Sequence, residues 1–169
     1  MNPAGADYQL LGVYSASLTS KVAQALRKLG TREAMVVHAL HGMDEISVTG
    51  RTMISRLRDD GSIDSLEYAP ADLSVRGVTT AELSVSSPED SAEIALDILS
   101  GADTTAGRTD TVVVNAAAAI ILGGLADDFD AAVPVARRSI ESGAAMKKLE
   151  GLIRKSGGNM EMMEDYAST

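Results

Sequence analysis

The sequence predicts an α/β fold in which a strand-helix-strand unit and a β-hairpin pack against a cluster of carboxyl-terminal helices. Three observations support this fold class. The first 40 residues contain two apolar, strand-like runs on either side of a helical segment. Two further strand-like runs flank a glycine turn near residue 60, and the second half of the chain carries helical signals. A chain of 169 residues can bury one core.

The first predicted unit is a crossover between two parallel strands. Residues 8–14 and residues 34–39 are apolar runs typical of buried strands. Between them lies a segment with apolar residues at helical spacing, which Ser15 or Ser17 can cap and which Gly30 ends. Because the joints are short, the two strands are expected to be parallel members of one sheet.

The second predicted unit is a β-hairpin. Residues 53–58 and 63–68 are strand-like, and the sequence Asp-Asp-Gly-Ser at 59–62 supplies a turn between them. Residues 46–49 alternate between apolar and polar side chains, whereas residues 70–84 carry no regular pattern.

The second half of the chain is predicted to be helical. Ser87 suits an N-cap and Pro88 the first helical position, so a helix is expected to run to about Leu99 and to end at Gly101. Residues 109–125 are nearly all Ala, Val, Ile and Leu, and are therefore expected to form a helix that is buried on all sides.

Two more helices are expected at residues 128–142 and 144–155, before Gly157 and Gly158. The resulting domain assignment is an α/β domain over residues 1–157 and a disordered tail over residues 158–169.

Composition excludes several classes of protein. The net charge of −9 and an aromatic content of 3% argue against a nucleic-acid partner, which would need clustered basic residues or aromatic platforms. The absence of cysteine excludes disulfides and thiolate nucleophiles, and it fits a reducing cytoplasm. The longest apolar stretch, residues 112–122, is about half of a membrane span, so a soluble protein without a membrane partner is expected.

Asp44 and Glu45 are the candidate metal ligands. They are adjacent acids that follow a predicted buried strand, and Gly42 allows the chain to bend just before them. Open α/β sheets bind ligands at the carboxyl ends of their strands, and Mg²⁺ takes one or two protein carboxylates with water and phosphate as its other ligands. From spacing alone, a magnesium site is one interpretation and a solvated turn is the other.

The remaining polar residues predict structural roles. His38 and His41 lack the third protein ligand that a zinc site needs, so His38 is expected to be partly buried and His41 to lie in a loop. Arg51 could approach a phosphate or remain solvated, and Asn115 is expected to be a buried amide that bonds backbone or a neighbouring helix. No glycine-rich phosphate loop occurs, and the sequence assigns no catalytic or cofactor-binding residue.

Four motifs together resemble the carboxyl-terminal half of the anthranilate phosphoribosyltransferase family. They occur in the family's order and at about its spacing, and the resemblance covers roughly residues 2–155. The matching motifs are Asn2-Pro3-Ala4-Gly5-Ala6 leading into Gln9-Leu10-Leu11-Gly12-Val13-Tyr14-Ser15; Gly42-Met43-Asp44-Glu45-Ile46-Ser47; Val114-Asn115-Ala116-Ala117-Ala118-Ala119; and Ile140-Glu141-Ser142-Gly143-Ala144-Ala145 followed by Lys148-Leu149.

The resemblance implies a fold and a reaction. The family transfers the phosphoribosyl group of phosphoribosyl pyrophosphate to anthranilate in tryptophan biosynthesis, releasing pyrophosphate. Its acid pair binds two Mg²⁺ ions; the residue that matches Glu45 touches both ions, and the residue that matches Asp44 touches one. Members have a large α/β domain and a small helical domain, which carries the homodimer contact.

The departures from the family define the hypothesis. The family's glycine-rich pyrophosphate loop, its Lys-His-Gly segment and the arginine beside anthranilate precede the position of Asn2, and the helical contact domain is missing as well. The chain is therefore interpreted as a fragment, an internal start or one product of a split gene, inactive until joined to the amino-terminal half. The alternatives are a non-catalytic interaction domain that retains the fold, or a related phosphoribosyltransferase or phosphorylase with another acceptor.

Overall fold

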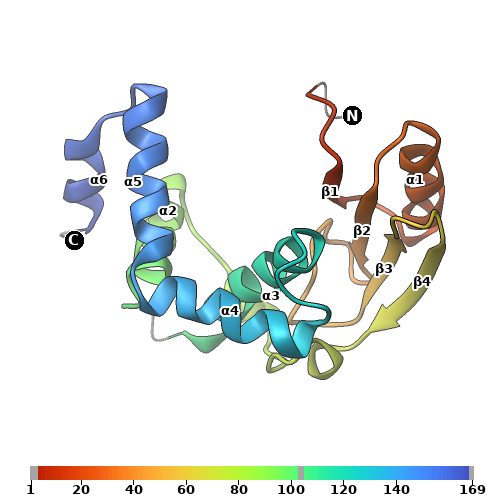
Figure 1. Cartoon of the computed structure of the whole chain (residues 1–169). Coiled ribbons are helices and arrows are strands. Elements are labelled where there is room, and N and C mark those ends of the chain that lie inside the picture. Colours follow the sequence, from red (N-terminus) through yellow and green to blue (C-terminus); the bar gives the residue numbers. More distant parts are fainter. Residues whose placement is uncertain (1–3, 103–104, 168–169) are drawn as a thin grey trace.

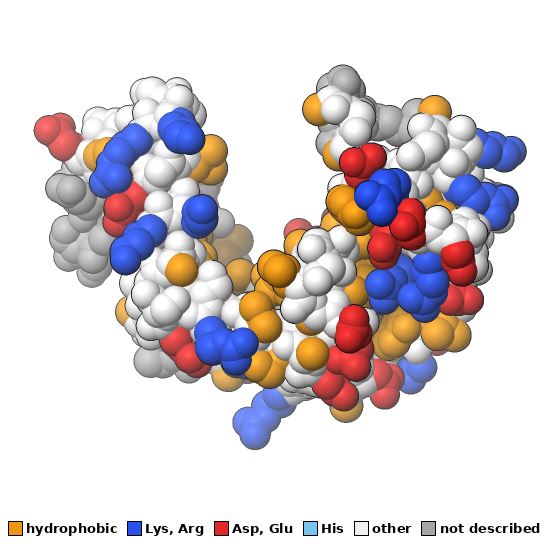
Figure 2. Space-filling view, viewed as in Figure 1, with side chains coloured by type: hydrophobic (Ala, Val, Ile, Leu, Met, Phe, Trp, Pro, Cys, Tyr) orange, Lys and Arg blue, Asp and Glu red, His pale blue; other side chains and the backbone are white. Residues whose placement is uncertain are grey.

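The computed structural model describes residues 4–102 and 105–167, which form an open crescent (Figure 1). The sheet and α1 make one arm, α2, α5 and α6 make the other, and α3 and α4 form the bend. The elements in chain order are β1 (Tyr8–Gly12), α1 (Ala16–Lys28), β2 (Glu33–Ala39), β3 (Thr52–Leu57), β4 (Ile63–Tyr68), the 3₁₀ turns η1 (Pro70–Leu73) and η2 (Thr80–Leu83), α2 (Pro88–Ser100), α3 (Ala106–Leu122), α4 (Phe129–Glu141), α5 (Ala144–Ser156) and α6 (Met160–Ala167). The space-filling view shows a deep hollow between the arms, with hydrophobic side chains along the bend (Figure 2).

The sheet confirms the predicted α/β class. Its strand order is β1-β2-β3-β4. β1 and β2 are parallel, with Tyr8 opposite Glu33, which confirms the crossover through α1. β2 and β3 are antiparallel, and β3 and β4 form the predicted hairpin, with Thr52 opposite Tyr68.

Strand β2 is the centre of the core because both of its faces are covered. Ala34 and Val36 belong to the cluster that packs under α1, together with Leu26. Met35 and Val37 point to the opposite face and join the larger cluster around α3 and α4. This alternation is the period of two that a strand imposes, and it places α3 on the same sheet face as Met35 and Val37.

The helix boundaries largely follow the predicted caps. At the start of α2, the Ser87 hydroxyl accepts a hydrogen bond from the Asp90 amide at 3.1 Å, and the helix ends at Gly101 with φ of 79°. At the start of α4, the carboxylate of Asp128 accepts from the Ala131 amide at 2.9 Å. α1 begins after Ser15, although the Ser15 hydroxyl caps no amide.

The prediction that the apolar helix is buried on all sides is wrong. Val113 and Val114 are fully buried, but Val112 is 38% exposed and Leu125, which lies beyond the end of α3, is 74% exposed. α3 packs against β1 and β2 on one side and against α4 on another. Among the described residues, its remaining side lines a cavity instead of a packed core.

The expected disordered tail is also corrected for residues 160–167, which form α6. The Asn159 side chain accepts a hydrogen bond from the Glu161 amide at 2.8 Å, which caps the first turn, and α6 packs against α2 and α5. The expected domain boundary at residue 157 stays a prediction. Within the described residues, no helix has the length and apolarity that a bilayer crossing would require.

Candidate functional site

The acid pair lies in a loop that follows β2. We call residues 40–51 the acidic loop. Asp44 and Glu45 are both exposed, and both line one open cavity of about 510 Å³. We call this the acid-pair cavity; its other lining residues are Leu10, Gly12, Val37, Thr111, Val112, Asn115 and Ala116. The predicted placement at the carboxyl end of β2 is therefore confirmed, with the end of β1 beside it.

Gly12 lets the acidic loop approach the sheet. A Cβ atom built on Gly12 would lie 1.6 Å from the backbone carbonyl oxygen of Asp44, far inside any van der Waals contact. Only glycine allows this approach of two backbones. Reasoning from the sequence did not single out Gly12 as a site residue, although a glycine inside a strand run is the signal for such an approach.

Asn115 of α3 holds the other side of the acid pair. Its Oδ1 accepts a hydrogen bond from the Ile46 amide at 3.1 Å, and its Nδ2 donates to the Ile46 carbonyl at 2.9 Å. Nδ2 also donates to the Thr111 carbonyl of its own helix at 2.9 Å. The sequence-based interpretation of Asn115 as an amide that bonds backbone is thus confirmed, and its contact is the residue directly after Glu45.

The acidic loop is closed by its own hydrogen bonds. The Ala39 amide donates to the Met43 carbonyl at 2.8 Å, and the Leu40 amide donates to the Arg51 carbonyl at 2.9 Å. Gly42 has φ of 114°, which supplies the bend that the sequence predicted.

Residues 46–49 alternate in sequence but form no strand, because side chains take over the role of a strand neighbour. Ile46 and Val48 are both fully buried and belong to the larger core cluster. The Ser47 amide donates to the Thr52 hydroxyl at 3.0 Å, and the Thr49 amide donates to the Ser47 hydroxyl at 3.0 Å. The backbone after the acid pair is therefore ordered without a ladder.

The side chains of the acid pair are unpaired in the part of the chain that the structure describes. Among the described residues, neither Asp44 nor Glu45 forms an ion pair or a hydrogen bond through its side chain; the ion pairs lie elsewhere. Adjacent unpaired carboxylates repel each other and attract a cation. Oxygen ligands from one or two residues suit Mg²⁺, which keeps several waters.

No group of three or more His, Cys, Asp or Glu side chains converges anywhere in the described part of the chain. A site of protein ligands alone, of the kind structural zinc requires, is therefore not built by these residues.

The other sequence candidates have structural partners. His38 is buried, more completely than expected, and its Nδ1 lies 2.8 Å from the Val13 carbonyl. His41 is exposed in the acidic loop, as expected, with Nε2 2.9 Å from the Thr49 hydroxyl. Arg51 pairs with Glu67 at 3.2 Å on the surface, which supports the interpretation of a solvated arginine.

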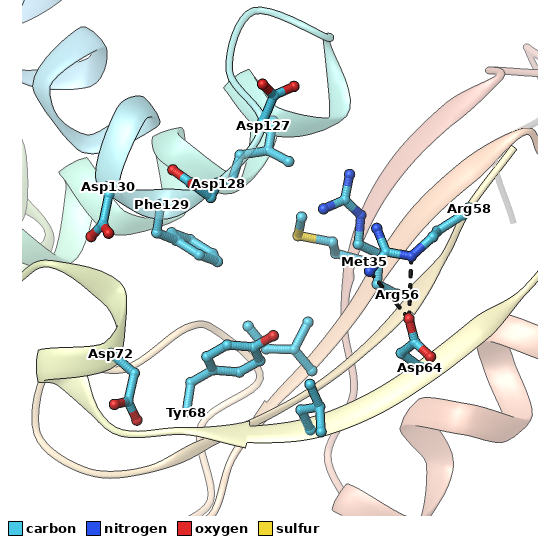
Figure 3. Close-up of a pocket in the computed structure, with 13 residues that line it drawn as sticks. Met35, Arg56, Arg58, Asp64, Tyr68, Asp72, Asp127, Asp128, Phe129 and Asp130 are labelled. Carbon is cyan, nitrogen blue, oxygen red and sulfur yellow. Dashed lines mark hydrogen bonds and ion pairs between the residues drawn. The ribbon is translucent and has the colours of Figure 1, made fainter.

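A second cavity of about 330 Å³ lies at the other end of α3, between the sheet and the start of α4 (Figure 3). We call it the arginine cavity. Arg56 and Arg58 lie on one side of it and Asp127, Asp128 and Asp130 on the other.

Most charges of the arginine cavity have a partner inside the fold. Arg58 pairs with Asp64 at 3.1 Å, and Arg56 pairs with Glu33 at 3.5 Å. Asp128 caps α4, and Asp130 accepts a hydrogen bond from the Ser74 hydroxyl. These charged groups therefore stabilise the pairing of the strands and the start of α4.

The chain is similar to known proteins over most of its length. The family model described as "Glycosyl transferase family, a/b domain" matches residues 1–146. An anthranilate phosphoribosyltransferase of Syntrophobacter fumaroxidans is 46% identical over 158 residues, which are 94% of this chain and 46% of that protein. An anthranilate phosphoribosyltransferase of Methanocorpusculum labreanum is 45% identical over 157 residues, which are 93% of this chain and 45% of that protein. The chain thus spans less than half the length of these relatives.

Solved structures share the fold. The anthranilate phosphoribosyltransferase of Thermus thermophilus superposes with a TM-score of 0.78 at 29% identity, over 90% of this chain and 44% of that one. The enzyme of Saccharomyces cerevisiae in complex with PRPP and Mg superposes with a TM-score of 0.75 at 24% identity, over 85% of this chain and 41% of that one. Asn2 and Pro3, at the start of the first matching motif, lie outside the described residues.

Proposed function

Because this chain belongs to the glycosyl transferase family and matches its a/b domain, we propose that it is the metal-binding half of an anthranilate phosphoribosyltransferase. The complete enzyme transfers the phosphoribosyl group of phosphoribosyl pyrophosphate to anthranilate in the cytoplasm, as a step of tryptophan biosynthesis. The names of the relatives indicate the reaction, and the acid-pair cavity contains the two carboxylates that would bind the metal.

The observation that carries the proposal is the adjacent pair Asp44 and Glu45, which lines one cavity without a counter-charge among the described residues. These two carboxylates would hold the Mg²⁺, two ions in all. When bound, Mg²⁺ would stabilise the negative charge of the departing pyrophosphate. The protein's own contribution is to keep both carboxylates exposed, adjacent and fixed at the strand ends.

The reaction also needs a loop that binds the phosphate groups. We assign this phosphate-binding loop to the part of the relatives that this chain does not span. Within the described residues, β1 pairs only with β2. The Asp7 carbonyl and the Val13 amide form hydrogen bonds on the side of β2. Backbone groups of successive strand residues point to opposite sides, so those of Tyr8, Leu10 and Gly12 point to the open edge of the sheet. A strand of the remaining polypeptide would pair with this edge and bring the phosphate-binding loop to the acid pair. That strand would belong to the same chain or to a partner.

The test is reconstitution. The purified chain is expected to show no turnover with anthranilate, phosphoribosyl pyrophosphate and Mg²⁺. Addition of a recombinant amino-terminal half of the Syntrophobacter fumaroxidans relative should restore turnover, and Asp44→Ala or Glu45→Ala should abolish it. Asp127→Ala is the matched control, since this exposed acid lines the arginine cavity and should leave the restored activity intact.

Other outcomes separate the alternatives. Turnover by the chain alone would refute its incompleteness. Binding of the amino-terminal half without turnover would support an interaction domain that keeps the fold. Turnover that survives both acid substitutions would refute the metal assignment.

A further inference from the structure

We propose that Asn115 is a positioning residue for the acid pair, and that its side-chain amide holds Asp44 and Glu45 in the arrangement that binds the metal. This inference rests on the proposed metal-binding function of the two carboxylates. It adds a residue that forms no hydrogen bond with either carboxylate in the described structure and acts through the backbone beside them.

The contact is a two-point clamp between distant parts of the chain. Asn115 accepts from the Ile46 amide at 3.1 Å and donates to the Ile46 carbonyl at 2.9 Å, across a separation of 69 residues. A side-chain amide that bonds both the N–H and the C=O of one residue forms the same two hydrogen bonds that a neighbouring strand would form. These two bonds fix the orientation of the backbone at Ile46. Because Nδ2 also bonds the Thr111 carbonyl, both of its hydrogens are used, so the side chain is locked to α3.

No other described contact bonds the backbone of Ile46. Ile46 is fully buried in a segment without a strand ladder, so its amide and carbonyl would be unsatisfied without Asn115. Glu45 is the preceding residue and is exposed. The clamp therefore acts at the point where the chain passes from the core to the carboxylates.

A second anchor lies on the other side of the pair. The Asp44 carbonyl is in close contact with Gly12 at the end of β1, and Ile46 is held by Asn115 of α3. The two acids thus lie between a contact to the sheet and a contact to a helix. Adjacent like charges tend to separate, so we infer that these anchors keep both carboxylates on one cavity.

The experiment uses the full chain and two substitutions at Asn115. Asn115→Leu removes all three hydrogen bonds, whereas Asn115→Asp keeps the shape and the acceptor but loses both donors. Val133→Ala on α4 is the control, because Val133 is a buried core residue outside the acid-pair cavity and its truncation lowers stability without touching the acidic loop.

Two measurements are made on each protein. Hydrogen exchange at the Ile46 amide reports the clamp, and a Mn²⁺ titration followed by electron paramagnetic resonance reports the acid pair. Both Asn115 variants should exchange faster at Ile46 and bind Mn²⁺ about 10–100-fold more weakly, the range typical when a residue that orients metal ligands is lost. Val133→Ala should leave the Mn²⁺ affinity unchanged, and any faster exchange at Ile46 should be matched by the other buried core amides. If Asn115→Leu fails to fold, Asn115→Asp still provides both measurements.

Three results would overturn the inference, and they are distinguishable. Unchanged Ile46 exchange in both variants would mean that the clamp does not hold the backbone. Faster exchange with unaltered Mn²⁺ affinity would mean that Asn115 is structural only. Absence of Mn²⁺ binding by the unaltered chain would refute the metal-binding function itself, whatever the exchange shows.

Discussion

The acid-pair cavity and the arginine cavity lie on the same sheet face, at opposite ends of α3, and they differ in how their charges are partnered. In the arginine cavity, Arg58 bonds Asp64 and Asp128 caps α4. In the acid-pair cavity, the carboxylates of Asp44 and Glu45 have no partner among the described residues.

The difference teaches that unmatched charge identifies the site better than the number of charges does. The arginine cavity has more charged groups, but most of them serve folding. Within the described residues, the carboxylates of the acid pair form no ion pair or hydrogen bond, although the backbone around them is held by Gly12 and Asn115. A rigid frame that carries unpaired carboxylates is what a cation site requires.

The largest expected effect comes from Gly12→Ala, which tests the rigidity of this frame. The new Cβ would collide with the Asp44 carbonyl, so the acidic loop must shift, and we expect a loss of about 1–3 kcal/mol in the free energy of unfolding. Urea denaturation measures this loss. Gly151→Ala is the matched control: Gly151 lies in α5 with open space around it, and the change should add up to about 1 kcal/mol. Equal effects at both positions would contradict the close contact.

A smaller effect separates the two cavities directly. Asp64→Asn removes the partner of Arg58, an exposed pair, and should lower the free energy of unfolding by about 0.2–1 kcal/mol. Asp44→Asn removes an acid without a described partner and relieves repulsion from Glu45, so stability should stay constant or rise slightly. If Asp44→Asn were the more destabilising of the two, the carboxylate would have a folding role and the comparison would fail.

The smallest effect is a pH dependence at an acid that does serve folding. Hydrogen bonds from the Ser86 amide and hydroxyl lower the pKa of Asp90, with a smaller opposing effect of burial. A carboxyl whose folded pKa is lowered stabilises the protein above its ordinary pKa, near 3.8, and this contribution is lost as the pH falls through the folded value. Asp90→Asn should therefore be less stable than the unaltered chain at pH 6, and the difference should vanish at low pH. A difference that stays constant with pH would refute this role.

Sequence patterns predicted the parts of the fold that depend on local structure. The crossover through α1 and the hairpin of β3 and β4 follow from short-range periodicity and turn residues, and the exposed acids follow from their place after β2. The exposed side of α3 was not predicted, because apolar composition cannot indicate which neighbours a helix has. The helix α6 was missed because its cap, Asn159, lies just after two glycines that signal an end.

The frame of the site was the least predictable part. From the sequence, Asn115 was expected to bond backbone, but its partner was unknown. The contact of Asn115 with Ile46 and that of Gly12 with Asp44 form only when the sheet and α3 pack together. These contacts join residues up to 69 positions apart in the chain. Such contacts leave no periodic signal in a single sequence.

The most direct test of the central claim is a calorimetric Mg²⁺ titration of the unaltered chain, the double variant Asp44→Asn with Glu45→Gln, and Asp127→Asn. Saturable binding that disappears in the double variant and persists in Asp127→Asn is the predicted result. Binding that survives in the double variant, or no binding by the unaltered chain, would contradict the assignment of a magnesium site to this acid pair.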